Sequence, residues 1–108
     1  MYPDSASWPA LLGEAALNRA AYGMLGEGRR SEAIALFEWI TVLHPDSANA
    51  RDSLAEACES AGDTAAAVVH SEKALALLEA DRALDQAGRD RLRTILTERL
   101  ERLKATKP

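Results

Sequence analysis

The sequence GRRSEAIALF at residues 28–37 returns in altered form as GDTAAAVVHS at residues 62–71, and this pair decides the fold. The two stretches begin 34 residues apart. Each is typical of a tight turn that leads into an amphipathic helix. The opening glycine suits the turn, because glycine readily takes the left-handed conformation that ends a helix. The recurrence therefore indicates stacked pairs of helices.

The same shift of 34 residues aligns further positions on either side of the two turns. Identical pairs include Ala21 with Ala55, Gly28 with Gly62, Ala33 with Ala67, Glu38 with Glu72 and Leu43 with Leu77. The small side chains among them would let two antiparallel helices approach closely. Larger residues between them would then wedge one helix pair against the next.

Hydrophobic periodicity and helix-ending residues predict five helices. We expect them at about residues 11–26, 31–43, 47–60, 64–79 and 85–105, after an N-terminal arm at residues 1–10. Pro45 ends the second helix, because proline disfavours helical geometry at the residue before it. Asp46 or Ser47 is expected to cap the third helix, and Asp63 and Asp85 are expected to cap the fourth and fifth.

The predicted last helix has a clear apolar stripe, so we expect it to cover the end of the stack. The stripe consists of Leu92, Ile95, Leu96, Leu100 and Leu103. The opposite face carries the charged residues, which we expect in solvent: Arg89, Arg91, Arg93, Glu98, Arg99, Glu101 and Arg102.

Composition supports an all-α protein, since alanine and leucine dominate and strand-favouring clusters are absent. Residues 1–81 carry five basic and thirteen acidic side chains, whereas residues 82–108 carry eight basic and four acidic ones. We attribute the basic end to the last turns of a helix, and the acidic body argues against nucleic acid. One cysteine, no signal peptide and no membrane-spanning stretch favour a cytoplasmic location.

These features resemble the tetratricopeptide repeat family, whose period is 34 residues. One repeat would span residues 14–47 and the next residues 48–81, followed by a capping helix at about 85–105. The family's small residue, turn glycine, second-helix alanine, aromatic residue and closing proline match Ala21, Gly28, Ala33, Phe37 and Pro45. In the second repeat Ser71 and Glu79 replace the last two of these. The resemblance implies an α–α superhelix with residues 11–108 as one domain.

A narrower resemblance concerns the sequence HPDSANARDSLAEA at residues 44–57. It looks like repeat modules appended to bacterial serine hydrolases and β-lactamase-like proteins, with Arg51 in place of a tyrosine and Ala55 in place of a glycine. This resemblance implies an accessory module that does not itself carry the hydrolase nucleophile.

Residues that could support catalysis are few, and we expect neither an enzyme, a cofactor nor a metal. His44 and His70 lack the spacing of a metal site. Cys58 lies at a helix-packing position, where an inert buried thiol is the simpler reading than a nucleophile.

Binding is the better candidate. In tetratricopeptide arrays the first helix of each pair lines a concave groove, and the resemblance places six candidate partner-binding residues there: Asn18, Tyr22, Asn49, Asp52, Glu56 and Glu59. Chaperone-binding members of the family hold two carboxylates with lysine, asparagine and arginine residues in the groove, and this sequence does not match that set. An acidic groove would favour a basic or extended peptide, although these carboxylates could also simply solvate a helix face.

Trp39 is a candidate interface residue, because its counterpart one repeat later is Lys73, at a position that normally faces water. Two repeats are few for a stable array, so a homodimer that covers Trp39 is an option, as is cover from the N-terminal arm. The sequence thus favours a non-catalytic module that binds a protein or peptide through its groove. The alternative is an accessory or oligomerisation domain of a larger hydrolase.

Overall fold

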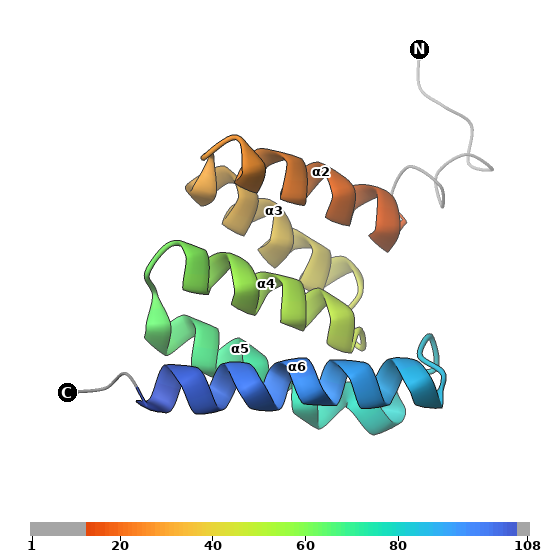
Figure 1. Ribbon diagram of the computed structural model, residues 1–108. Coiled ribbons are helices and arrows are strands. Elements are labelled where there is room, and N and C mark those ends of the chain that lie inside the picture. The colour runs from red at the N-terminus through yellow and green to blue at the C-terminus, as the bar shows by residue number, and fades with distance from the viewer. Residues whose placement is uncertain (1–12, 106–108) are drawn as a thin grey trace, which may run out of the picture.

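The computed structural model describes residues 13–105, and all regular structure in that range is helical (Figure 1). The helices are α2 (Glu14–Gly26), α3 (Arg30–Leu43), α4 (Ala48–Ser60), α5 (Thr64–Leu77) and α6 (Gln86–Ala105), with one 3-10 turn, η1 (Leu78–Ala80), after α5. This confirms the all-α class. The predicted N-terminal arm lies outside the described residues.

The turn between α2 and α3 and the turn between α4 and α5 have the same backbone geometry. Gly28 and Gly62 have φ values of +82° and +83°, in the left-handed region. The residue after each glycine donates its backbone N–H to a carbonyl of the preceding helix. Arg29 donates to the Met24 carbonyl and Asp63 to the Cys58 carbonyl, both at 2.9 Å. A Cβ atom would meet nothing within 4 Å at either glycine, so backbone conformation and not space requires glycine there.

The helix boundaries follow the predicted caps, with two corrections. The side chains of Ser47, Asp63 and Asp85 accept hydrogen bonds from the first turns of α4, α5 and α6. However, α2 begins at Glu14 after an extended Gly13, and α5 ends at Leu77, two residues earlier than expected. The chain tightens into η1 after Leu77 and then turns toward α6.

Small residues at the helix crossings behave as the repeat predicts. Ala21, Ala33, Ala55 and Ala67 are all fully buried. They let α2 pack on α3 and α4 on α5, while the larger residues fill the layer between the two pairs. That layer contains Phe37, Ile40 and Leu54, each at most 1% exposed. We expect most of the folding free energy to come from this layer, because apolar burial is the dominant favourable term.

Helix α6 closes a second apolar cluster against α4, α5 and η1. Its members are Ala48, Ala74, Leu78, Leu92 and Leu96. Two assignments on α6 were wrong: Ile95, predicted to be buried, is 41% exposed, and Arg99, predicted to face solvent, is 5% exposed. Arg99 can be buried because it forms an ion pair with Asp52 of α4.

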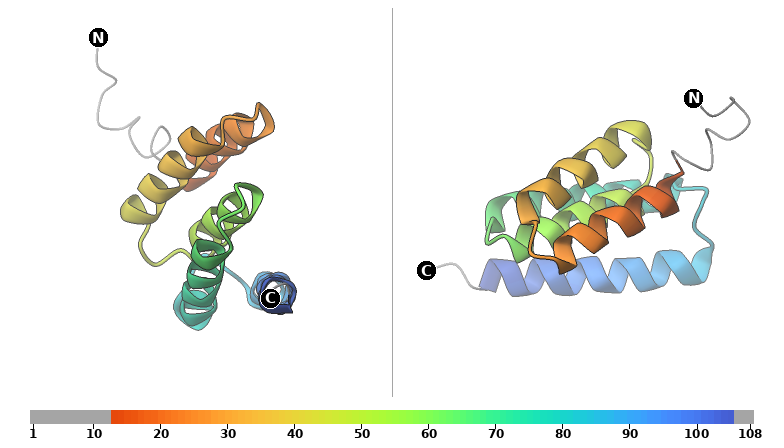
Figure 2. Two further views of the ribbon diagram at one scale, coloured as in Figure 1. Left: turned by 90° about the vertical axis from the view of Figure 1, so that its left-hand side faces the viewer. Right: turned by 90° about the horizontal axis from the view of Figure 1, so that it is seen from above.

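The helices divide between two sides of the molecule. In the right-hand view of Figure 2, α2 and α6 lie on one side, while α3 and α5 lie on the other. In Figure 1, α4 runs between α2 and α6. We call this side the α2–α4–α6 face; all six predicted partner-binding residues belong to α2 or α4.

Candidate functional site

The α2–α4–α6 face is held together by a buried ion pair. The Arg99 guanidinium donates to the Asp52 carboxylate at 2.7 Å, and the Asp52 side chain is itself 12% exposed. Arg99 Nη1 also lies 3.5 Å from the Ser71 hydroxyl of α5. One arginine of α6 therefore contacts both helices of the second pair.

Burial changes the electrostatics of Asp52. Loss of water raises the pKa of this carboxyl above its ordinary value, and the bonded Arg99 guanidinium opposes the rise without cancelling it. Asp52 is thus a structural group in this fold, already paired within the chain.

Glu59 is engaged in the same way, about two turns further along α4. Arg102 makes two hydrogen bonds to its carboxylate, each 3.0 Å long, and the Nε atom of Arg99 lies 3.7 Å from it. This fork-to-fork geometry is typical of arginine with a carboxylate. Two of the three acidic residues expected in the groove are therefore neutralised by α6.

The third acidic residue, Glu56, pairs with a residue of the other repeat. The Tyr22 hydroxyl donates to Glu56 Oε1 at 2.7 Å and lies 3.1 Å from the Ser53 hydroxyl. Burial is the main cause that raises the pKa of Tyr22. The Tyr22 ring packs edge-on against Phe37, with a centroid separation of 5.0 Å. Tyr22 thus links α2 to α4 and is anchored in the core at the same time.

Asn18 and Trp39 complete the predicted residues. Asn18 is half-buried on α2, and its side-chain oxygen has no hydrogen-bond partner among the described residues. Trp39 is 46% exposed on α3, away from the α2–α4–α6 face, and Val42 of the same helix is 72% exposed. The predicted groove residues and the predicted interface residue therefore belong to different sides.

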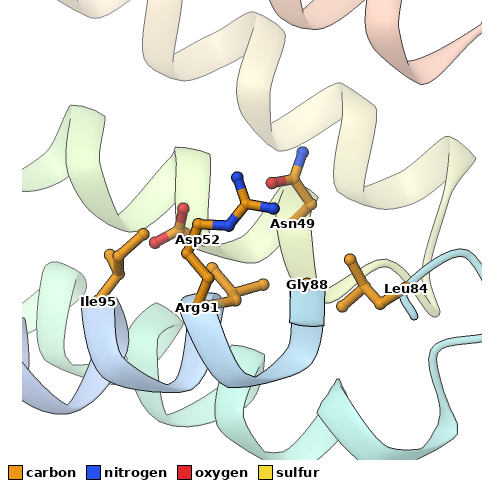
Figure 3. Close-up of a pocket in the computed structure, with 7 residues that line it drawn as sticks. Asn49, Asp52, Leu84, Gly88, Arg91 and Ile95 are labelled. Carbon is orange, nitrogen blue, oxygen red and sulfur yellow. The ribbon is translucent and has the colours of Figure 1, made fainter. Parts of the chain in front are cut away.

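An open pocket of about 230 Å³ lies between the N-terminal halves of α4 and α6 (Figure 3). It is lined by Asn49, Asp52, Leu84, Gly88, Arg91, Leu92 and Ile95. A second open pocket of about 300 Å³ shares Asn49 and Leu84 with the first and continues to Glu14 and Ala15 of α2. We call the two together the α4 groove.

Arg91 is the basic residue that lines the first pocket of the α4 groove, whereas the acidic residues Glu14 and Asp81 line the second. In Figure 3 its guanidinium reaches from α6 toward α4 and ends between Asp52 and Asn49. Within residues 13–105 it forms no hydrogen bond or ion pair. The other arginines of α6 are all engaged: Arg89 with backbone carbonyls, Arg93 with Glu79 and Asp90, Arg99 with Asp52, and Arg102 with Glu59.

The reactive residue types do not assemble into a second site. Cys58 is 4% exposed, and burial raises the pKa of its thiol, which keeps it protonated. His70 is half-buried, with its Nδ1 atom 3.4 Å from the Arg51 guanidinium. Across residues 13–105 no group of three or more histidine, cysteine or acidic side chains could hold a metal ion. In the same range, each helix is too short or too polar to cross a membrane.

Sequence reasoning found Asn49 and Asp52 but missed Arg91, Ile95 and Leu84, which line the pocket with them. The missing information was where α6 lies. One signal could have supplied it: the acidic body and the basic last quarter of the chain are complementary, which predicts that the last helix packs on acidic α4.

Comparison with protein families, curated proteins and solved structures gave no significant match to this chain.

Proposed function

We propose that this chain is a non-catalytic protein-interaction module of the tetratricopeptide type, which binds an extended peptide segment in the α4 groove. The observation that carries the proposal is the pair of adjoining open pockets along α4, which meet at Asn49 and Leu84. A groove of this kind offers polar groups and apolar side chains to a chain laid across it.

The helix arrangement supports the tetratricopeptide assignment. Two helix pairs repeat with matching left-handed turns at Gly28 and Gly62, and α6 covers the second pair. The first helix of each pair contributes to the α2–α4–α6 face, as the resemblance implies. A cytoplasmic location remains part of the proposal.

The preference for a basic partner was predicted from acidic side chains that the fold already engages. Asp52 and Glu59 are already paired with arginines of α6, and Glu56 accepts a hydrogen bond from Tyr22. The partner's chemistry therefore depends on the groups of the groove that are unpaired among the described residues.

Selection from a displayed library of random peptides tests the proposed function. We expect the full chain to enrich particular peptides, and we expect Asn49→Trp to abolish their binding, because an indole at exposed Asn49 would fill both pockets. The matched control is Ala65→Trp, at an exposed position of α5 outside the groove. Equal binding to both variants would contradict the proposal.

A second candidate is an oligomerisation module, and the exposed pair Trp39 and Val42 favours it. The two residues are three apart on α3, so they lie on one face of that helix. A second copy that covers this face would also compensate for the small number of repeats.

Light scattering on the wild type and on Trp39→Glu tests this second candidate. We expect a dimer that the glutamate converts to monomer, since a buried charge at the interface is costly. Ile95→Glu, on the opposite side of the molecule, is the control and should leave the dimer intact. A monomeric wild type at high concentration would rule the candidate out.

A further inference from the structure

We propose that the α4 groove selects an internal peptide segment in which an acidic side chain neighbours an apolar one, with Arg91 binding the carboxylate. This inference rests on the proposed peptide-binding function and deepens it. It names the chemistry of the partner and reverses the charge that the acidic residues of α4 suggested.

The charges in the pocket point to a carboxylate. Asp52 is the acidic residue that lines it, and Arg99 neutralises that carboxylate at 2.7 Å. Arg91 then leaves this first pocket with a positive charge, whereas the second pocket has the acidic side chains of Glu14 and Asp81. Its guanidinium has no partner among residues 13–105, in contrast to its four neighbours on α6.

The polar geometry suits a carboxylate as well. Arg91 presents a planar fork of N–H donors, which matches the two oxygens of a carboxylate. Asn49 is exposed on the opposite wall, and its side-chain amide can donate to the same group. Figure 3 shows the two side chains converging from α6 and α4 across the pocket.

Apolar surface adjoins this polar pair. Ile95 lies one helical turn after Arg91 and is 41% exposed, and Leu84 is half-buried at the point where the two pockets meet. An apolar side chain next to the bound carboxylate would cover both. Because the groove continues past Leu84 toward Ala15, we assign it an internal segment and not a chain end.

The test compares the peptides that the full-length wild type and two variants enrich from a random library displayed within a larger protein. We expect wild-type peptides to be rich in Asp or Glu beside Leu, Ile, Val or Phe. Arg91→Gln should lose the acidic preference and bind a wild-type peptide about tenfold or more weakly, as expected for a lost charge-assisted contact. Arg91→Glu should select Lys or Arg instead.

The matched control is Arg93→Gln, which removes an arginine two residues away that pairs with Glu79 and Asp90 outside the groove. It should select the same peptides as the wild type. Arg91 is exposed, so circular dichroism should show all these variants to be folded. Synthetic versions of one selected peptide with an amidated and a free carboxyl end should bind equally if an internal side chain is recognised.

The outcomes separate the two proposals. Enriched peptides without an acidic preference, or an unchanged selection by Arg91→Gln, would overturn this inference and leave the proposed function standing. Stronger binding of the free carboxyl end would replace the internal segment by a chain end. A library from which nothing is enriched would overturn both.

Discussion

At the scale of single residues, the two positive-φ glycines fix the register of the whole chain. Gly28 and Gly62 set the length of each turn, and this length decides which residues of α3 and α5 face the core. Their requirement is for a backbone conformation, because the space around both is open. Another glycine, Gly23, lies inside α2 and provides a direct comparison.

We predict opposite effects of alanine at Gly28 and Gly23. Gly28→Ala should destabilise the fold by about 1–2 kcal/mol, since an L-residue pays that cost in the left-handed conformation. Gly23→Ala should stabilise it by up to about 1 kcal/mol, because alanine is the better helix former. Urea unfolding of both variants measures the difference. Equal effects of the two changes would show that the turn at residue 28 does not require the left-handed backbone conformation of Gly28.

His70 gives a prediction about pH. Burial, followed by the charge of Arg51, lowers the pKa of His70 below its ordinary value of 6.5. The unfolded chain therefore binds more protons at this site, so the stability contributed by neutral His70 is lost as the pH falls below about 6.5. We expect the urea midpoint to drop less between about pH 8 and about pH 5.5 in His70→Gln than in the wild type. An identical drop in both proteins would exclude His70 as the cause.

At the scale of elements, α6 shows what a helical pattern can and cannot predict. Ile95 and Arg99 both lie next to the stripe formed by Leu92 and Leu96, so their positions alone allow either to be buried. Hydrophobicity favours Ile95, and the prediction followed it. The structure buries Arg99 instead, because Asp52 on α4 meets it, and such a pairing depends on tertiary contacts that periodicity does not contain.

The two arginines that attach α6 to α4 should differ strongly in importance. Arg99→Met leaves the buried Asp52 carboxylate without its cation and should cost about 3–5 kcal/mol. Arg102→Gln removes an arginine whose side chain is 56% exposed, and we expect little change in the urea midpoint. Equal losses in the two variants would contradict the distinction.

The loss in Arg99→Met should also depend on pH. Burial already raises the pKa of Asp52 in the wild type, and without Arg99 nothing opposes that rise. A raised folded-state pKa means that protonated Asp52 favours folding, and that this stability is lost as the pH rises through the folded value. The variant should therefore be closest to the wild type in acid and furthest from it at neutral pH, as measured by urea unfolding at each pH.

At the scale of the whole molecule, the sequence predicted the general architecture better than the site. The 34-residue repeat, the turns and the caps are local patterns, and the structure confirms an all-α chain with those turns and those caps. The α4 groove depends on where α6 lies, and no local pattern states that. Asn49 and Asp52 could be found from the register, whereas Arg91 could be found only after α6 had been placed.

Removing α6 should unfold the second helix pair. A chain that ends at Asp85 would expose Ala74 and Leu78 and leave Asp52 unpaired. We expect a lower helix content by circular dichroism and a broadened thermal transition. A separate peptide of residues 85–108 should restore both when it is added. An intact, sharp transition in the shortened chain would show that α6 is dispensable for folding.

The Arg99–Asp52 pair, whose members lie 47 residues apart, also imposes an order on how the protein is made. The first helix pair can form as soon as α2 and α3 leave the ribosome, since its contacts are local. The apolar side of the second helix pair stays exposed until residue 103 has emerged, because the leucines of α6 from Leu92 to Leu103 cover it. During synthesis the chain therefore exposes apolar surface between the time α5 leaves the ribosome and the time α6 does. Slow codons or a pause in that interval would favour aggregation or chaperone capture, even though α6 covers Ala74 and Leu78 once it has packed.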